Sequence, residues 1–237
     1  PKTGGIRARR ADGTGREPFD PTAAGYGSDF TEGNAWQYSW YVPQDVPGLV
    51  AAMGGEAKFV DKLDALFDAK VDPAHFKHVE DITGLIGWYA HGNEPSHHIA
   101  YLYDYAGAPW KTQQRLKQIM DSQYAARPDG LSGNDDLGQM SAWYVFTALG
   151  FYPVAPGSDQ YALGRPFVAR AAIHLDGGRT FTITAAPLDD AHPYVGSVTL
   201  NGKPLERPML RHGQIVAGGE LHFTMQAQPA SSWSATH

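Results

Sequence analysis

Cysteine is absent from the 237 residues of the chain, and its absence excludes disulfides, thiolate metal sites and cysteine nucleophiles. Long apolar runs are also lacking. None approaches the roughly 20 residues that a helix needs to cross a bilayer, so no membrane span is predicted. The 19 Lys and Arg residues against 25 Asp and Glu residues give a net charge of −6. With no tail of either sign, this balance argues against a nucleic acid or an anionic membrane surface as partner.

Motifs of several enzyme classes are missing as well. The sequence contains no HExxH zinc motif, no glycine-rich phosphate loop and no Gly-x-Ser-x-Gly elbow. Phosphoryl transfer and serine hydrolysis are therefore excluded. A polysaccharide lyase would need a Tyr or His base and a cationic partner for its uronate substrate. The chain is instead rich in acidic clusters, which disfavour that reaction.

The patterns that are present predict three regions. Residues 1–30 are rich in Gly, Arg, Asp and Pro without periodicity, which is typical of a solvated lead-in loop. Residues 31–158 show helical periods, and residues 159–237 alternate with period 2 and include an Asn201-Gly202 hairpin signal. The predicted fold class is therefore mainly α with a C-terminal region of antiparallel β-strands.

Individual helices can be predicted within the helical region. Thr31 is a candidate cap for a helix that carries Trp36 and Trp40 on one face. Apolar residues at 59–67 follow the spacing of an amphipathic helix after Gly54-Gly55, and another helix is predicted to end at Gly150.

Three polar segments stand at the predicted mouths of helices: residues 31–38, 91–98 and 133–140. Acids at helix starts are common as caps, but each of these segments also contains an amide and an aromatic or His residue. Asp, Glu, Asn and Gln supply the planar hydrogen bonds that sugars require, and Trp36, Trp88 and Trp143 offer apolar faces for pyranose rings. The three segments together indicate a carbohydrate site.

A pair of carboxyl groups can hydrolyse a glycosidic bond, one as proton donor and the other as base or nucleophile. Sequence spacing does not give the distance between them, so inverting and retaining chemistry stay equally open. His97 and His98 are adjacent and do not share a helix face, which favours a hydrogen-bonded pair over metal ligands. If a metal binds among these oxygen-rich groups, Ca²⁺ is favoured over Zn²⁺.

The same segments resemble the signature blocks of the calcium-dependent exo-α-mannosidases of glycoside hydrolase family 92. The resemblance is carried by Glu32-Gly33-Asn34-Ala35-Trp36-Gln37-Tyr38, by Gly92-Asn93-Glu94-Pro95-Ser96-His97-His98, and by Gly133-Asn134-Asp135-Asp136 with the run from Gln139 to Pro153. It implies part of an (α/α)₆ barrel whose following strands would pack with a β-sandwich. It also implies removal of terminal α-mannose with inversion and a Ca²⁺ cofactor.

Residue roles follow from position in these blocks. The resemblance implies Glu32 as general acid and Asp136 as general base. Family members often carry an acid where Asn134 stands here, so a second candidate base is missing at that position. Asp135 is included among the catalytic candidates, without being equated with that missing acid. The predicted substrate-binding residues are Trp36, Gln37, Trp88, Asn93, Glu94, His97, His98 and Asn134. The metal ligands are expected near Glu94 and Asp136, without individual assignment.

The resemblance also predicts context for the chain. Family members are much longer, so we expect a fragment that works with an N-terminal remainder on mannose-containing glycans, with α-1,2 linkages favoured. A secreted or periplasmic location is expected because glycan-processing members are usually exported. Three alternatives stay open: another (α/α)₆-barrel glycosidase, a carbohydrate-binding fragment without turnover, and a degraded pseudoenzyme.

Overall fold

The computed structural model describes residues 5–230. Contacts between residues divide the chain into two compact units. Among the described residues, the first unit comprises 5–99 together with Gln123–Met140, and the second comprises Ala100–Ser122 together with 141–230. The three polar segments therefore belong to the first unit, apart from the continuation of the last one into a helix.

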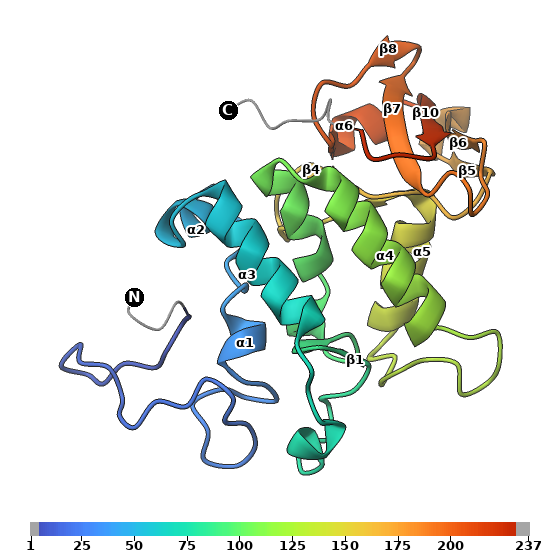
Figure 1. The fold of residues 1–237 in the computed structure, drawn as a ribbon. Helices are drawn as coiled ribbons and strands as arrows, with labels where there is room; N and C mark the ends of the chain where they lie inside the picture. The colour runs from blue at the N-terminus through green and yellow to red at the C-terminus, as the bar shows by residue number, and fades with distance from the viewer. Residues whose placement is uncertain (1–4, 231–237) are drawn as a thin grey trace. The chain divides into compact units, whose positions relative to one another are not determined.

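The first unit consists of short helices, one small hairpin and extended loops (Figure 1). The longest helix follows Gly54-Gly55, as predicted, and buries Phe59, Leu63 and Leu66 completely. Burial of each such side chain contributes about 1.5–3 kcal/mol. The elements of this unit are α1 (Ala35–Tyr38), η1 (Pro43–Asp45), α2 (Val46–Ala52), α3 (Glu56–Asp68), η2 (Pro73–Phe76), β1 (Leu85–Ile86), β2 (Tyr89–Ala90) and η3 (Glu94–Ser96).

The start of α1 differs from the prediction. Thr31 does not cap a helix, because the chain turns through Glu32 and Gly33 and the helix begins at Ala35. Asn34 is the cap: its side chain accepts a hydrogen bond from the backbone N–H of Trp36, and the Gln37 side chain accepts one from the backbone N–H of Asn34. This reciprocal arrangement is a capping box. It frees the preceding residues, including Glu32, to form a loop.

The remaining elements run from the second polar segment to the end of the described chain. A 3₁₀ helix and two α-helices precede the strands, and the last of these helices ends before Gly150, which has φ +92° as a helix-ending glycine should. These elements are η4 (Ile99–Ala106), α4 (Pro109–Gln123), α5 (Gln139–Leu149), β3 (Phe151–Tyr152), β4 (Gln160–Leu163), β5 (Arg170–His174), η5 (Asp176–Gly178), β6 (Thr180–Ala186), β7 (Tyr194–Leu200), β8 (Lys203–Pro204), β9 (Met209–Arg211), α6 (His212–Val216) and β10 (Gly219–Gln226).

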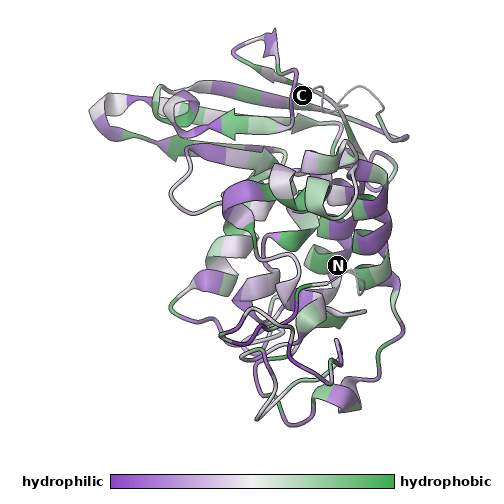
Figure 2. Ribbon diagram, turned by 90° about the vertical axis from the view of Figure 1, so that its left-hand side faces the viewer, coloured by the Kyte–Doolittle hydropathy of each residue, from purple (hydrophilic) through white to green (hydrophobic). Residues whose placement is uncertain are grey.

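The strands of the second unit form a five-stranded sheet in the order β5-β6-β10-β7-β8 and a three-stranded sheet in the order β3-β4-β9. Alternate residues of β6 and β10 are buried, as period 2 predicts, and they form one apolar core with neighbouring strands. Figure 2 shows hydrophobic and hydrophilic stretches along the strands.

One part of the fold-class prediction is wrong. The C-terminal strands are not all antiparallel, because β10 runs parallel to β6 while it pairs antiparallel with β7. The chain returns through β8, β9 and α6 before β10 inserts between β6 and β7. Period 2 fixes which face of a strand is buried but not which strand lies beside it, so the sequence pattern could not reveal this parallel pair.

The helices of the described residues are all too short or too polar to span a bilayer.

Candidate active site

Glu32 lies in the loop before α1, with an exposed side chain and a backbone φ of +48°. The Asn93 side chain joins this loop to the second polar segment. Its Nδ2 donates a hydrogen bond to the backbone carbonyl of Glu32 over 2.8 Å, and its Oδ1 accepts one from the backbone N–H of Glu94 over 3.1 Å. A single buried amide therefore links the segments that carry two of the predicted site acids.

The third segment reaches the same place through Asp136. The Glu94 carboxyl lies within hydrogen-bonding reach of the Asp136 carboxyl. Partial loss of solvent, followed by the neighbouring carboxylates Glu94 and Asp135, raises the pKa of Asp136. Asp136 and Leu137 adopt left-handed backbone conformations with φ of +47° and +58°, so a tight, strained turn presents this carboxyl. Glu32, Glu94, Asp135 and Asp136 thus all belong to the first compact unit of the fold.

His97 and His98, which follow Glu94 in the second segment, are buried. The Nε2 of His97 donates to the backbone carbonyl of His91 over 2.9 Å, and its Nδ1 accepts from the Gln139 amide over 3.1 Å. The Nε2 of His98 donates to the backbone carbonyl of Trp40 over 2.8 Å. Burial lowers the pKa of each imidazole to about 4. Both rings are therefore neutral near pH 7 and act as hydrogen-bonding supports in this conformation.

These buried histidines predict a loss of stability on mild acidification. The unfolded imidazoles bind protons below about pH 6.5, whereas folded His97 and His98 stay neutral down to about pH 4. The free energy of unfolding should therefore fall as the pH drops from about 6.5 towards 4. Calorimetric melting between pH 5 and 7 checks this. In a His98→Gln variant, Tm should depend less steeply on pH than in the parent. The matched change at an exposed position, His78→Gln, should leave the pH dependence of Tm unchanged. The same pH dependence in the parent and in both variants would contradict the explanation.

The predicted aromatic residues form a wall next to the Glu32 loop. The rings of Trp36 and Trp88 stack with centroids 6.0 Å apart and an interplanar angle of 7°. Gln37 is 2% exposed, and its Nε2 donates to the backbone carbonyl of Trp88 over 2.6 Å. The Gln37 amide therefore holds the wall in place. Trp143 is completely buried, so the prediction that it offers a face to a sugar ring is wrong.

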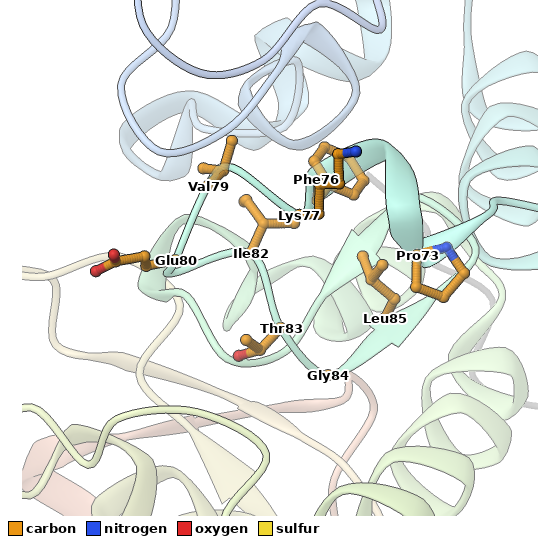
Figure 3. A pocket seen from close by; sticks show the side chains of 9 residues that line it. All are labelled: Pro73, Phe76, Lys77, Val79, Glu80, Ile82, Thr83, Gly84 and Leu85. Atoms are coloured by element: carbon orange, nitrogen blue, oxygen red, sulfur yellow. The ribbon is translucent and has the colours of Figure 1, made fainter.

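Asn134 lies at the exposed edge of the third segment, where its amide contacts the Asp81 carboxyl over 3.4 Å. Residues between 73 and 85, on either side of Asp81 in sequence, line a hollow of about 450 Å³; they include Phe76, Glu80 and Ile82 (Figure 3). None of the predicted site residues lines this hollow. The acids and the tryptophan wall, rather than this hollow, hold the chemistry that the sequence predicted.

Sequence reasoning gave no role to three residues that shape the site. Gln139 supports His97, and Tyr38 supports the loop of Glu32 through a hydrogen bond to the Thr31 carbonyl. His91 lies between the hydroxyls of Tyr89 and Tyr124, 2.7 Å from each. All three residues stand inside the polar segments. The partners His97 and Tyr124 lie 42 and 33 residues away from Gln139 and His91, so only the fold reveals these two contacts.

No group of three or more His, Cys, Asp or Glu side chains able to hold a metal ion occurs among residues 5–230. The Glu94 and Asp136 carboxyls nevertheless face each other, and paired carboxylate oxygens are the donor type that Ca²⁺ prefers. Ca²⁺ takes 6–8 oxygen ligands, commonly including backbone carbonyls and waters. The pair fits such an ion as two of its ligands.

Comparisons with known proteins show the family of the chain. The profile of the glycosyl hydrolase family 92 catalytic domain matches residues 1–227. The chain belongs to glycoside hydrolase family 92. A curated relative from Arthroderma benhamiae, described as an uncharacterized secreted glycosidase, is 32% identical over 205 residues, which cover 85% of this chain and 24% of that protein.

Two solved structures of the family come from Bacteroides thetaiotaomicron. A family 92 α-mannosidase in complex with mannoimidazole is 42% identical with a TM-score of 0.88, over 96% of this chain and 30% of that one. A family 92 inverting mannosidase is 38% identical with a TM-score of 0.84, over 97% of this chain and 32% of that one. The chain thus spans about a quarter to a third of the length of these relatives.

Proposed function

We propose that the chain forms the catalytic part of an exo-α-mannosidase that removes terminal α-linked mannose from glycans with inversion, α-1,2 linkages being favoured. The observation that carries the proposal is the convergence of three acid-bearing segments through Asn93 and the Glu94–Asp136 contact. Similarity to α-mannosidases, one of them named as inverting, supports the substrate and the stereochemistry.

In the proposed reaction, Glu32 is the general acid and protonates the glycosidic oxygen as the bond to the leaving group breaks. Asp136 is the general base: it takes a proton from the water that attacks the anomeric carbon on the opposite face. The contact with Glu94 disfavours ionisation of Asp136 and so makes its carboxylate a stronger base once formed. Asp135 adds negative charge beside it and is the second candidate for this role.

The substrate pocket is proposed to use the tryptophan wall and the polar edges around it. Trp36 and Trp88 offer apolar surface to the sugar ring, while Asn134 and Glu94 offer hydrogen bonds. Gln37, Asn93, His97 and His98 already bond to the backbone, so their proposed contribution is to hold the pocket's shape.

Calcium is the proposed cofactor, held near Glu94 and Asp136 by oxygen ligands that are not assigned individually. When bound, the cation would supply positive charge that polarises sugar hydroxyls. The protein residues themselves position the substrate and move the protons.

The proposal extends to the architecture around the site. Because the chain spans only about a quarter to a third of the relatives' length, we propose that activity needs further sequence. That sequence would complete an (α/α)₆ barrel and add a β-sandwich, with the chain itself divided into a lead-in at 1–30, a helical region at 31–158 and a β region at 159–237. A secreted or periplasmic location is proposed, supported by the curated relative's description as secreted.

Chelation is expected to abolish mannose release, and added Ca²⁺ to restore it, because the proposed cation lies at the carboxyls that position the substrate and the attacking water. The measurement is free mannose released from α-1,2-mannobiose, by this chain alone and by the chain joined or mixed with the remainder carried by a relative. Mg²⁺ added in place of Ca²⁺ is the control.

Two outcomes would contradict this proposal in different ways. Full activity in excess chelator would remove calcium while keeping the mannosidase. No release in any mixture, from well-folded protein that still binds mannosides, would replace the enzyme with a carbohydrate-binding fragment.

A further inference from the structure

The backbone of Glu32 is held in a conformation that a glutamate rarely adopts alone. Its φ of +48° lies in the left-handed region, which is unfavourable for a residue with a side chain. Surrounding contacts must therefore hold it there. They also set the direction of the exposed Glu32 side chain, because the side chain of a turn residue follows its backbone.

Two side chains donate hydrogen bonds to consecutive backbone carbonyls of this loop. Asn93 donates to the carbonyl of Glu32, and the hydroxyl of Tyr38 donates to the carbonyl of Thr31 over 2.6 Å. The Tyr38 ring also stacks on Phe30 with centroids 5.3 Å apart and an interplanar angle of 30°. It leaves no room for a side chain at position 33, where a Cβ would lie 2.8 Å from the ring.

Tyr38 is itself firmly placed. It is the last residue of α1, whose start is closed by the Asn34–Gln37 capping box and whose Gln37 side chain is tied to the Trp88 carbonyl. Burial and then the Glu32 carboxylate raise the pKa of the Tyr38 phenol. The hydroxyl thus lies within the electrostatic reach of Glu32, and it stays protonated and able to donate.

We propose that Tyr38 is a positioning residue for Glu32, which fixes the left-handed turn of residues 30–33 through its hydroxyl and its ring. The inference rests on the proposed function, in which Glu32 is the proton donor. The phenol proton is directed to the Thr31 carbonyl, so Tyr38 acts through the backbone and not on the substrate. Its loss should therefore weaken proton donation more than substrate binding.

Tyr38→Phe keeps the ring and removes the hydrogen bond to Thr31. In the active preparation, chain plus remainder, we expect kcat on an unactivated mannobiose to fall about 10- to 100-fold, since small misplacements of a catalytic group cost rates of this order. KM should change less than threefold. An aryl mannoside with a good leaving group, which needs little protonation, should lose less than threefold in kcat.

Tyr26→Phe is the matched control, because it removes one phenol hydroxyl at a fully exposed position, and it should leave both substrates unaffected. Equal losses of Tyr38→Phe on the two substrates, or no loss on either, would overturn the positioning role. If Glu32→Gln itself shows no dependence on the leaving group, the proposed function fails as well. A parent protein without turnover would overturn both together.

Gly33→Ala is a second variant that disturbs the placement of Tyr38 against the Glu32 loop, here by a change in the loop. The new methyl group would displace the Tyr38 ring. It should reproduce the leaving-group dependence of Tyr38→Phe, and the double variant should lose much less than the product of the two single losses. Independent, multiplicative losses would show that Tyr38 and the Gly33 turn do not act on Glu32 as one unit.

Discussion

Replacing Glu32 with glutamine is expected to slow the release of mannose from substrates with poor leaving groups by roughly 10²–10⁴-fold, the usual contribution of a positioned proton donor. Glutamine matches glutamate in shape but has no proton to give at neutral pH. Because the Glu32 side chain is exposed and its backbone is held by Asn93 and Tyr38, the substitution should leave folding unaffected.

The dependence on the leaving group distinguishes a proton donor from a residue that merely binds. Rates of Glu32→Gln on a series of aryl mannosides should approach those of the parent as the leaving group becomes more acidic. Glu80→Gln changes another exposed glutamate of the same unit and should match the parent throughout. An equal loss on every substrate would remove Glu32 from the acid role.

The candidate site could be predicted from sequence to the level of its segments. The polar blocks around Glu32, Glu94 and Asp136 each place an acid beside an amide at a turn, and this pattern survives in the structure. Their convergence could not be predicted by spacing, because it depends on Asn93 reaching across 61 residues to the Glu32 carbonyl. Residue types indicated a carbohydrate site shared by the three blocks, and the resemblance to family 92 gave the roles of the individual acids.

Local periodicity predicted the fold best for helices and strands that bury one apolar face and expose the other. The α3 helix and the alternation of β6 appear as predicted, because each buries a single apolar face. Prediction failed where a partner distant in sequence decides the structure. The capping box at Asn34 displaced the expected helix start at Thr31, and β10 took a parallel partner that no local pattern encodes.

The largest effect on stability is expected for Gly87→Ala. Gly87 forms the turn of the β1–β2 hairpin with φ +61°, directly against the last turn of α3. A Cβ there would lie 2.2 Å from the carbonyl oxygen of Leu66 and 2.7 Å from that of Phe67. Backbone atoms cannot rotate aside as a side chain can, so the hairpin must move away from the helix.

That movement carries several costs at once. The hydrogen bond from the Trp88 N–H to the Leu66 carbonyl, 2.8 Å long, would be lost, which costs about 1 kcal/mol. The left-handed backbone adds about 1–2 kcal/mol, and overpacking about 1–3 kcal/mol or more. A total of about 4 kcal/mol is a large part of the roughly 5–15 kcal/mol that holds a protein folded, and calorimetry should show a fall in Tm of roughly 10 °C or more.

Gly13→Ala is the control that separates the steric clash of a Cβ with the α3 carbonyls from the strain of a left-handed backbone. Gly13 also has a positive φ, of +82°, but open space surrounds its Cβ position in the described part of the chain. It should therefore lower Tm by only a few degrees, and similar shifts for the two variants would refute the collision.

Trp88 also stacks on Trp36, and its backbone carbonyl accepts the Gln37 hydrogen bond. Because displacing the hairpin displaces the tryptophan wall, Gly87→Ala should weaken mannoside binding even below its Tm.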